Sequence, residues 1–267
     1  MKKSHLIAGV ALVAVMVAVA LIARQLADQQ KDTTGADNSL EPIEAQLEAG
    51  EYAEAIAELE AAVERDPENS EAHFLLAQAY NQTNELLKAA EEYRTVLALD
   101  PDNAAAHHNL GVTYYQLQDP NAAVAEFEAA LELDPDDPDT HYQLGATYLV
   151  LALSTDPVGS ADSPLMNQAI TEFEAALEAR ADMPEALIGM ANIYIQQADY
   201  ANAIETLQRA IEQAPTSPEA YYALGEAHAR SGDTESACEA YGRFLELNPP
   251  GTWRTQAEQA MTTLGCP

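Results

Sequence analysis

Residues 70–103 read SEAHFLLAQAYNQTNELLKAAEEYRTVLALDPDN, and residues 104–137 read AAAHHNLGVTYYQLQDPNAAVAEFEAALELDPDD. The second stretch repeats the pattern of the first after 34 residues. One alanine of this pattern recurs along most of the chain, at Ala55, Ala89, Ala123, Ala169, Ala203 and Ala237. The intervals between these alanines are 34, 34, 46, 34 and 34 residues. A fixed period of this length indicates stacked copies of one small supersecondary unit.

Each recurring alanine begins an apolar helical face. A large apolar residue follows at +4, and a further apolar residue at +7, which is the spacing of one face of a helix. The +4 residues are Leu59, Tyr93, Phe127, Phe173, Leu207 and Tyr241, and the +7 residues are Ala62, Val96, Ala130, Ala176, Ala210 and Phe244. Proline lacks an N–H and disfavours helix in the residue before it, so we expect these helices to end before Pro67, Pro101, Pro135, Pro215 and Pro249.

Another helix precedes each of these. Its mark is a large apolar residue followed by a small one, at Leu76–Ala77, Leu110–Gly111, Leu144–Gly145, Met190–Ala191 and Leu224–Gly225. Three positions later comes a ring, at Tyr80, Tyr114, Tyr148, Tyr194 or His228. The pattern predicts that the small residue lets two helices approach closely and that this ring fills the space beside it.

These features together resemble the tetratricopeptide repeat, a 34-residue unit of two helices. The resemblance implies an all-α, right-handed superhelical solenoid of about six units within a domain spanning 41–267. The predicted units are 36–69, 70–103, 104–137, 138–183, 184–217 and 218–251. The first unit departs from the pattern, with Pro42 and Ile43 where the leucine–small pair is expected, and Ala181 replaces the proline of the fourth unit.

Two segments flank or interrupt the repeats. Residues 252–264 carry Trp253, Ala257 and Leu264 at helical spacing, which predicts a capping helix over the last unit. The fourth unit holds 12 extra residues (46 − 34), and its segment 154–164 is rich in turn-forming residues. Such a loop either carries function or is a passively tolerated insertion.

The amino-terminal segment has a separate character. After a short start, 1–5, the residues 6–23 form an uncharged apolar run that spans about 27 Å as a helix, enough for a bilayer core. We expect an uncleaved transmembrane signal anchor, followed by a polar linker at 24–40. Lys2 and Lys3 favour a cytoplasmic amino terminus and an extracytoplasmic repeat domain. A cleaved signal peptide, which would release a secreted or periplasmic binder, is the alternative.

Charge excludes one class of partner. The chain has 44 acidic and 12 basic residues, a formal net charge of −32. Phosphate binding needs clusters of Lys and Arg, so nucleic acid is not expected as a partner. A basic partner is conceivable, although a well-solvated acidic surface is the simpler interpretation.

No pattern in the sequence predicts catalysis. There is no dinucleotide-binding, Walker A, G-x-S-x-G or H-E-x-x-H motif, so we expect no enzyme activity and no cofactor. Three histidines recur at the repeat period, His73, His107 and His141. Equivalent positions on stacked helices lie roughly 8–10 Å apart, too far for one metal ion, and we expect these histidines to pack between helices.

The two cysteines, Cys238 and Cys266, come near one end of the predicted stack. Cys238 begins the second helix of the last unit, and Cys266 follows a cap that should run antiparallel to it. A disulfide that fastens the cap is one prediction, and two unpaired thiols are the other.

The resemblance also implies a binding site. Family members use a concave groove lined by the first helix of each unit, into which an extended peptide or an amphipathic helix fits. Matched to that pattern, the groove residues are Phe74, Gln78, Asn81, His108, Val112, Tyr115, Tyr142, Ala146, Leu149, Ile188, Asn192, Ile195, Tyr222, Glu226 and Arg230. The lysines of the family's carboxylate clamp are missing, so that function is not expected.

The resemblance extends to bacterial membrane-anchored members that serve translocation, cytochrome maturation or envelope assembly. It implies a non-catalytic, membrane-tethered adaptor that binds a partner protein in this groove. A structural homo-oligomer, in which the groove or the cap packs against another copy, is the alternative from another class.

Overall fold

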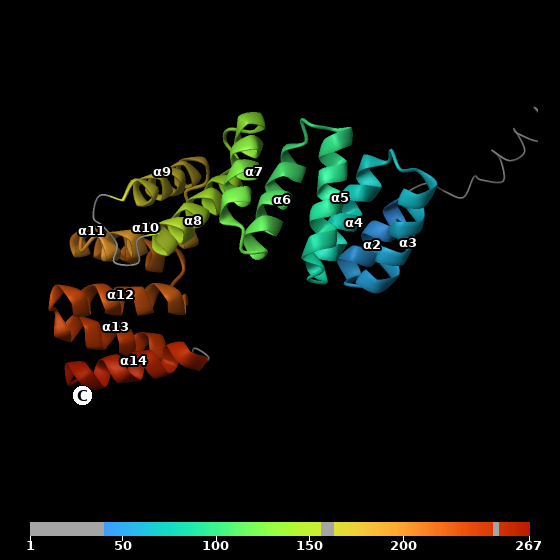
Figure 1. The fold of residues 1–267 in the computed structure, drawn as a ribbon. Coiled ribbons are helices and arrows are strands. Elements are labelled where there is room, and N and C mark those ends of the chain that lie inside the picture. Colours follow the sequence, from blue (N-terminus) through green and yellow to red (C-terminus); the bar gives the residue numbers. More distant parts are fainter. Residues whose placement is uncertain (1–39, 156–162, 248–250) are drawn as a thin grey trace, which may run out of the picture. The chain divides into compact units, whose positions relative to one another are not determined.

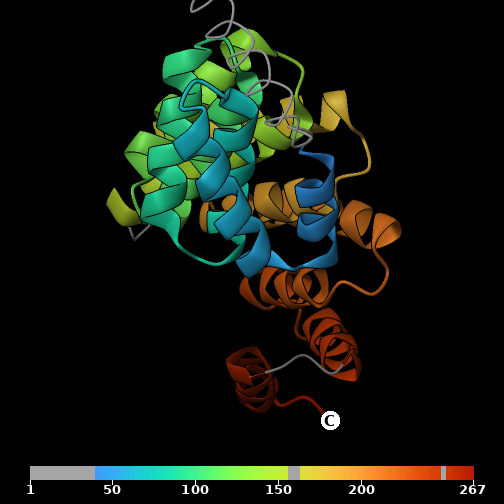
Figure 2. The same ribbon diagram turned by 90° about the vertical axis from the view of Figure 1, so that its right-hand side faces the viewer.

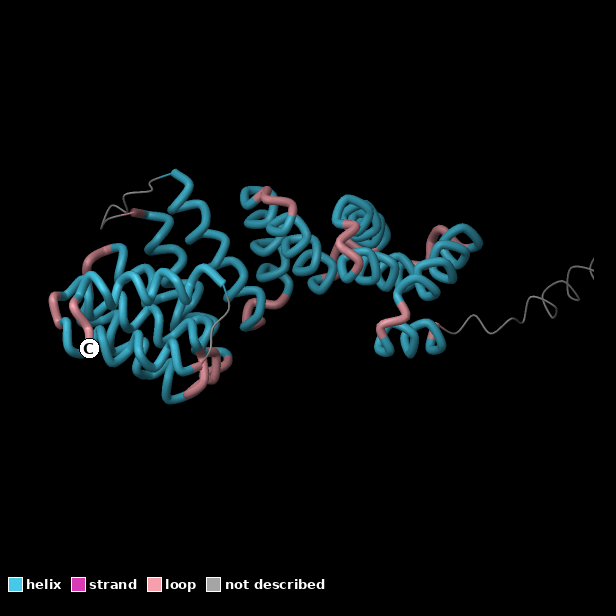
Figure 3. The backbone as a smooth tube through the Cα atoms, turned by 90° about the horizontal axis from the view of Figure 1, so that it is seen from below, coloured by secondary structure: helices cyan, strands magenta, loops and turns pink. Residues whose placement is uncertain are grey.

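A computed structural model describes residues 40–155, 163–247 and 251–267. These residues form thirteen helices and no strand (Figure 3). The chain divides into two compact units, 1–49 and 50–267, which are described separately. The first contains α2 (Glu41–Ala49). The second contains α3 (Tyr52–Arg65), α4 (Ser70–Gln82), α5 (Leu86–Leu99), α6 (Ala104–Gln116), α7 (Pro120–Leu133), α8 (Pro138–Thr155), α9 (Pro164–Ala179), α10 (Pro184–Gln196), α11 (Tyr200–Gln213), α12 (Pro218–Ser231), α13 (Thr234–Glu246) and α14 (Gly251–Leu264).

The helices of the second unit pack in chain order. Five hairpins follow one another, α4–α5, α6–α7, α8–α9, α10–α11 and α12–α13, and each packs on the next (Figure 1). The first helices of successive hairpins also contact one another, from α4 through α6, α8 and α10 to α12. The first helices therefore form a continuous layer, and the surface of that layer is called the first-helix face below.

The recurring alanines and their +4 residues form the core, as the period predicts. Ala55, Ala89 and Ala123 are fully buried, and so is Phe127. The second helices end two residues before a proline at Arg65, Leu99, Leu133 and Gln213, also as predicted. Pro249 lies outside the described residues.

The glycines of the predicted pairs do allow close packing, but the ring expected beside them was wrong. A Cβ placed on Gly111 would lie 2.7 Å from the ring of Phe127, and one on Gly225 would lie 2.7 Å from Tyr241. The ring that covers the glycine therefore comes from the second helix of the same hairpin, at the +4 position. It is not the ring three residues further along the first helix.

Those first-helix rings instead tie one hairpin to the preceding one. The hydroxyl of Tyr80 donates to Glu60 on α3 at 2.6 Å, and that of Tyr148 donates to Glu128 on α7 at 2.8 Å. Each partner lies 20 residues upstream, on the preceding second helix. These rings therefore stabilise the stacking of hairpins rather than the packing inside one hairpin.

The turns inside the hairpins share one backbone conformation. Asn84, Gln118, Ala198 and Gly232 all have positive φ angles, between 59° and 89°. All four occupy the equivalent position, between the first and second helix of a hairpin. Ala198 and Gln118 adopt this left-handed conformation without glycine's freedom, so the packing of the two helices outweighs the local cost.

The periodic histidines form a repeated hydrogen-bonded clamp. Nδ1 of His107 on α6 lies 2.7 Å from Oε2 of Glu126 on α7, and Nε2 lies 3.3 Å from the carbonyl oxygen of Pro101. His73 makes the same contacts with Glu92 and Pro67, and His141 makes them with Glu172 and Pro135. The histidines pack between helices as expected, and they also join each hairpin to the loop before it.

The end of the chain is covered by α14, which matches the predicted cap. This helix packs beside α13 (Figures 1 and 2). Ala257 is buried there, and Met261 and Leu264 join the apolar cluster around Tyr241. Cys238 and Cys266 are disulfide-bonded in the structure, with Cα atoms 5.6 Å apart.

The residues of the amino-terminal predictions lie outside the described part of the chain. The start 1–5, the apolar run 6–23 and the linker up to residue 39 are not described. Among the described helices, none is both long and apolar enough to cross a bilayer. Most of the insertion, 156–162, also lies outside the described residues, although α8 extends toward it to Thr155.

Candidate protein-binding face

The fifteen predicted groove residues all lie on the five first helices α4, α6, α8, α10 and α12. Thirteen are half-buried, which is the exposure of a side chain that supports the fold and still meets solvent. The two exceptions are Ile195, which is 2% exposed, and Arg230, which is exposed. Arg230 also lies one residue beyond the position equivalent to Asn81, where Ala229 stands.

In four of the five sets the first residue is a ring that rests on a core ring of its own hairpin; the exception is Ile188, whose hairpin has Leu207 at the core position. The ring centroids of Phe74 and Tyr93 lie 5.7 Å apart, and those of Tyr142 and Phe173 lie 5.9 Å apart. His108 on Phe127 and Tyr222 on Tyr241 repeat the arrangement at 5.9 and 5.8 Å. These contacts fix the rings against the core, so the face presents rigid aromatic surface.

The last residues of the sets are used in stacking. Nδ2 of Asn81 donates to Oγ1 of Thr113 on the next first helix at 2.9 Å. Arg230 contacts Glu226 at 3.1 Å, and one of its nitrogens lies 3.5 Å from the carbonyl oxygen of Ile195. Asn81, Ile195 and Arg230 therefore hold hairpins together, and we assign them no direct role in binding.

The middle of the face is brought together from several helices. Burial raises the pKa of Tyr142 on α8, and the nearby Glu185 on α10 and Tyr115 on α6 raise it further. These three helices therefore place their side chains in one neighbourhood. One turn further along the same helices are the smaller half-buried side chains of Gln78, Val112, Ala146 and Asn192.

At its C-terminal end the face continues onto the cap. The rings of Tyr222 and Trp253 have centroids 5.1 Å apart, and Trp253 is 44% exposed. The sequence predicts only that Trp253 belongs to the capping helix. Its place beside a first-helix tyrosine could not be read from the sequence, because the orientation of α14 depends on how it docks.

One edge of the face carries a set of carboxylates that the sequence analysis missed. Acidic residues occupy the first turns of four first helices, at Glu71, Asp139, Glu185 and Glu219. Each stands three residues before the first residue of a set, and hence on the same helical face. The spacing was visible in the sequence, but the general acidity of the chain obscured it.

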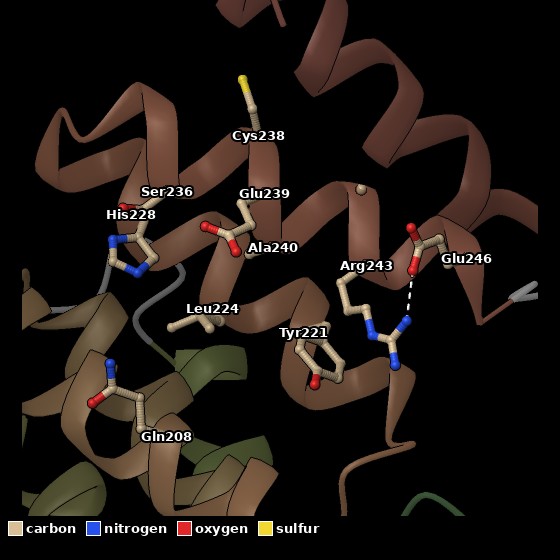
Figure 4. Close-up of a pocket in the computed structure, with 11 residues that line it drawn as sticks. Gln208, Tyr221, Leu224, His228, Ser236, Cys238, Glu239, Ala240, Arg243 and Glu246 are labelled. Atoms are coloured by element: carbon tan, nitrogen blue, oxygen red, sulfur yellow. Dashed lines mark hydrogen bonds and ion pairs between the residues drawn. The ribbon is translucent and has the colours of Figure 1, made fainter. Parts of the chain in front are cut away.

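Another cavity, of about 750 Å³, lies away from this face and involves α11, α12 and α13 (Figure 4). Its arginine, Arg243, is already paired with Glu246 at 2.6 Å. Cys238 points away from His228 and Leu224, and its sulfur belongs to the disulfide. Within the described part of the chain, no group of three or more His, Cys, Asp or Glu is placed to hold a metal ion. The first-helix face is therefore a stronger candidate for a binding site than this cavity.

Comparison with protein-family models finds tetratricopeptide repeats along most of the chain. Models described as tetratricopeptide or TPR repeats match residues 43–104, 92–125, 113–150, 166–210, 191–232 and 218–250. A comparison with curated proteins finds no match.

Solved structures show the same fold. PilF of Pseudomonas aeruginosa has a TM-score of 0.67 at 23% identity, covering 83% of this chain and 95% of its own. PilW, a type IV pilus biogenesis factor, has a TM-score of 0.67 at 18% identity, covering 81% and 94%. YrrB, a TPR protein with an unusual peptide-binding site, has a TM-score of 0.58 at 22% identity, covering 75% and 97%.

Proposed function

The chain belongs to the tetratricopeptide-repeat family, and from this we propose that it is a non-catalytic scaffold whose first-helix face binds a segment of a partner protein. The observation that carries the proposal is the row of half-buried rings on four first helices, α4, α6, α8 and α12, each fixed on a core ring of its hairpin. The peptide-binding site of YrrB and the part of PilW in type IV pilus biogenesis fit such a scaffold.

Binding by this face would need little rearrangement. The rings of Phe74, Tyr142 and Tyr222 are already ordered, so a partner does not have to immobilise them. Ordering side chains on binding costs roughly 0.5–1.5 kcal/mol for each rotamer-rich group, and a pre-ordered face avoids most of that cost.

We further propose that residues 6–23 anchor the chain in a membrane, with the repeats on the extracytoplasmic side. The support is the uncharged apolar run and the lysines before it. A tether would raise the local concentration of the binding face at the membrane. Amino-terminal sequencing of the mature protein tests this, because an intact start keeps the anchor. A start beyond residue 20 would show cleavage and release.

The binding proposal is tested with full-length protein by chemical crosslinking. One variant places arginines on the first-helix face, as Gln78→Arg, Ala146→Arg and Asn192→Arg. Its matched control adds the same charge to exposed positions of second helices, as Ala57→Arg, Ala125→Arg and Ala201→Arg. None of these substitutions replaces a ring that packs on the core.

We expect the face variant to lose crosslinks that both the wild type and the control variant retain, while circular dichroism shows that all three remain helical. Equal crosslinking of the same partners by the face variant and the control would overturn the assignment. Crosslinks that join only copies of this chain would point to a homo-oligomer instead.

A further inference from the structure

We propose that the partner segment is an amphipathic helix with Lys or Arg residues beside its apolar stripe. This inference rests on the proposed function and specifies the chemistry of its ligand. It is drawn from charge complementarity along the aromatic row of the first-helix face.

The first observation is the position of the carboxylates. Glu71, Glu185 and Glu219 are exposed in the first turns of α4, α10 and α12. They stand three residues before Phe74, Ile188 and Tyr222 respectively. Residues three apart on a helix are surface neighbours, so each carboxylate borders the aromatic or apolar row.

The second observation is the lack of opposing charge. Residues 41–267 contain eight Lys and Arg residues, of which Arg230 alone lies on a first helix among those described. Arg230 is paired with Glu226. The other seven lie on second helices, on the cap or at the end of α9. The five first helices thus carry five acidic residues against one basic residue that is already paired, while the second helices of the same hairpins are more acidic still.

Carboxylates also lie close to the rings. Oδ2 of Asp137 lies 3.9 Å from Nδ1 of His108, and besides burial, Glu185 contributes to the raised pKa of Tyr142 on the preceding hairpin. A cavity of about 280 Å³ lies at this edge, lined in part by His108, Asp137 and Asp139. Asp139 also contacts Arg180, so a partner cation would share that carboxylate.

The spacing of equivalent residues on successive first helices favours a helical partner segment over an extended strand. Packed helices lie about 8–10 Å apart, so equivalent residues recur at about that distance along the face. Seven residues of a helix rise about 10.5 Å and return to nearly the same side. A helix with basic residues every seventh position would therefore meet the first-turn carboxylates of three successive first helices, Asp139 on α8, Glu185 on α10 and Glu219 on α12. In a strand, residues three apart point to opposite sides.

The general acidity of the chain would attract a basic peptide to any of its surfaces. The test must therefore separate this general attraction from specific binding at the carboxylates of the first-helix face. The face variant is Glu71→Gln, Glu185→Gln and Glu219→Gln. The matched control is Glu91→Gln, Glu178→Gln and Glu212→Gln, which removes three exposed charges from second helices. Both variants have the same net charge.

The probes are three fluorescent 21-residue peptides. The first has a leucine stripe flanked by lysines at heptad spacing, the second has glutamates in place of the lysines, and the third has the composition of the first in shuffled order. Binding to the full chain in nanodiscs of zwitterionic lipid is measured by fluorescence anisotropy, with empty nanodiscs as the blank.

We expect the lysine peptide to bind, and to bind the face variant about five- to tenfold more weakly than the wild type, as for three exposed ion pairs. The control variant should change binding less than twofold. Equal weakening of both variants, or equal binding of the glutamate or shuffled peptide, would overturn the proposal. If the lysine peptide does not bind, but the variant with arginines at positions 78, 146 and 192 still abolishes crosslinking to the partner, only this inference is overturned. If crosslinking is also unaffected, the proposed function falls with it.

Discussion

Gly111 on α6 faces Phe127 on α7 so closely that a Cβ on the glycine would lie 2.7 Å from two carbons of the ring. The two residues belong to one hairpin, and Gly225 with Tyr241 repeats the relationship in the last hairpin. Phe127 is fully buried and also meets His108 of the binding face. The same contact therefore closes the hairpin and positions the surface ring above it.

We predict that Gly111→Ala destabilises the protein by about 1–3 kcal/mol, because the added methyl overpacks the ring of Phe127. Gly242→Ala on α13 is the control, since a Cβ there meets nothing within 4 Å. That change should be neutral or stabilising by up to about 1 kcal/mol, the helix propensity of alanine over glycine. Urea denaturation followed by circular dichroism measures both. Similar midpoints for the two variants would contradict the packing argument.

Much of this fold was predictable because a period of 34 residues fixes which face of each helix is buried. The partner of each glycine was not. Tyr114 and Phe127 are both correctly spaced for a helical face, and only the docking of α6 on α7 decides which ring covers Gly111. The turn at Ala198 was equally hidden, because alanine gives no local signal for a φ of 59°.

The histidine clamp leads to a second prediction. His107 and Glu126 have side chains that are 18% and 23% exposed, so their contact is largely screened from water. A double-mutant cycle with His107→Ala and Glu126→Ala should give a coupling of about 0.5–1.5 kcal/mol. The exposed pair Arg243 and Glu246 should give at most about 0.5 kcal/mol. If the exposed pair couples as strongly, burial does not strengthen the clamp.

The sequence indicated the position of these histidines but not their partners. Glu126 follows His107 by 19 residues, as Glu92 follows His73. In the fourth unit the insertion lengthens the interval to 31 residues, between His141 and Glu172. The third pair becomes visible only in the structure, where α8 and α9 bring His141 and Glu172 into the same contact despite the longer interval.

A third prediction concerns pH. Burial lowers the pKa of His108 below its ordinary value, although Asp137 and Asp139 oppose the shift. The folded state therefore binds this proton less readily than the unfolded state, and stability contributed by neutral His108 is lost as pH falls below about 6.5.

His108→Asn removes that titration and can keep a donor toward Thr140, which His108 contacts at 2.6 Å. The stability advantage of the wild type over this variant should therefore shrink between pH 8 and pH 5. The two proteins share every other residue, so the change in their difference with pH reports on position 108. Thermal unfolding at each pH provides the measurement, and an advantage that grows on acidification would show that the carboxylates dominate over burial.

The bond between Cys238 and Cys266 leads to the last prediction. It closes a loop across 28 residues and fastens the end of α14 to α13. In the chain-entropy model such a loop is worth about 3–4 kcal/mol. Cys238→Ser with Cys266→Ser should therefore lower the unfolding temperature and make α14 more sensitive to limited proteolysis, because Ala257 is its one fully buried side chain.

Trp253 reports on the cap locally, since its fluorescence should shift to the red as its contact with Tyr222 loosens. Reductant should reproduce these effects in the wild type and change nothing in the double serine variant. If reductant leaves the wild type unaltered, the cap is held by its apolar contacts with Tyr241 and Phe244 alone.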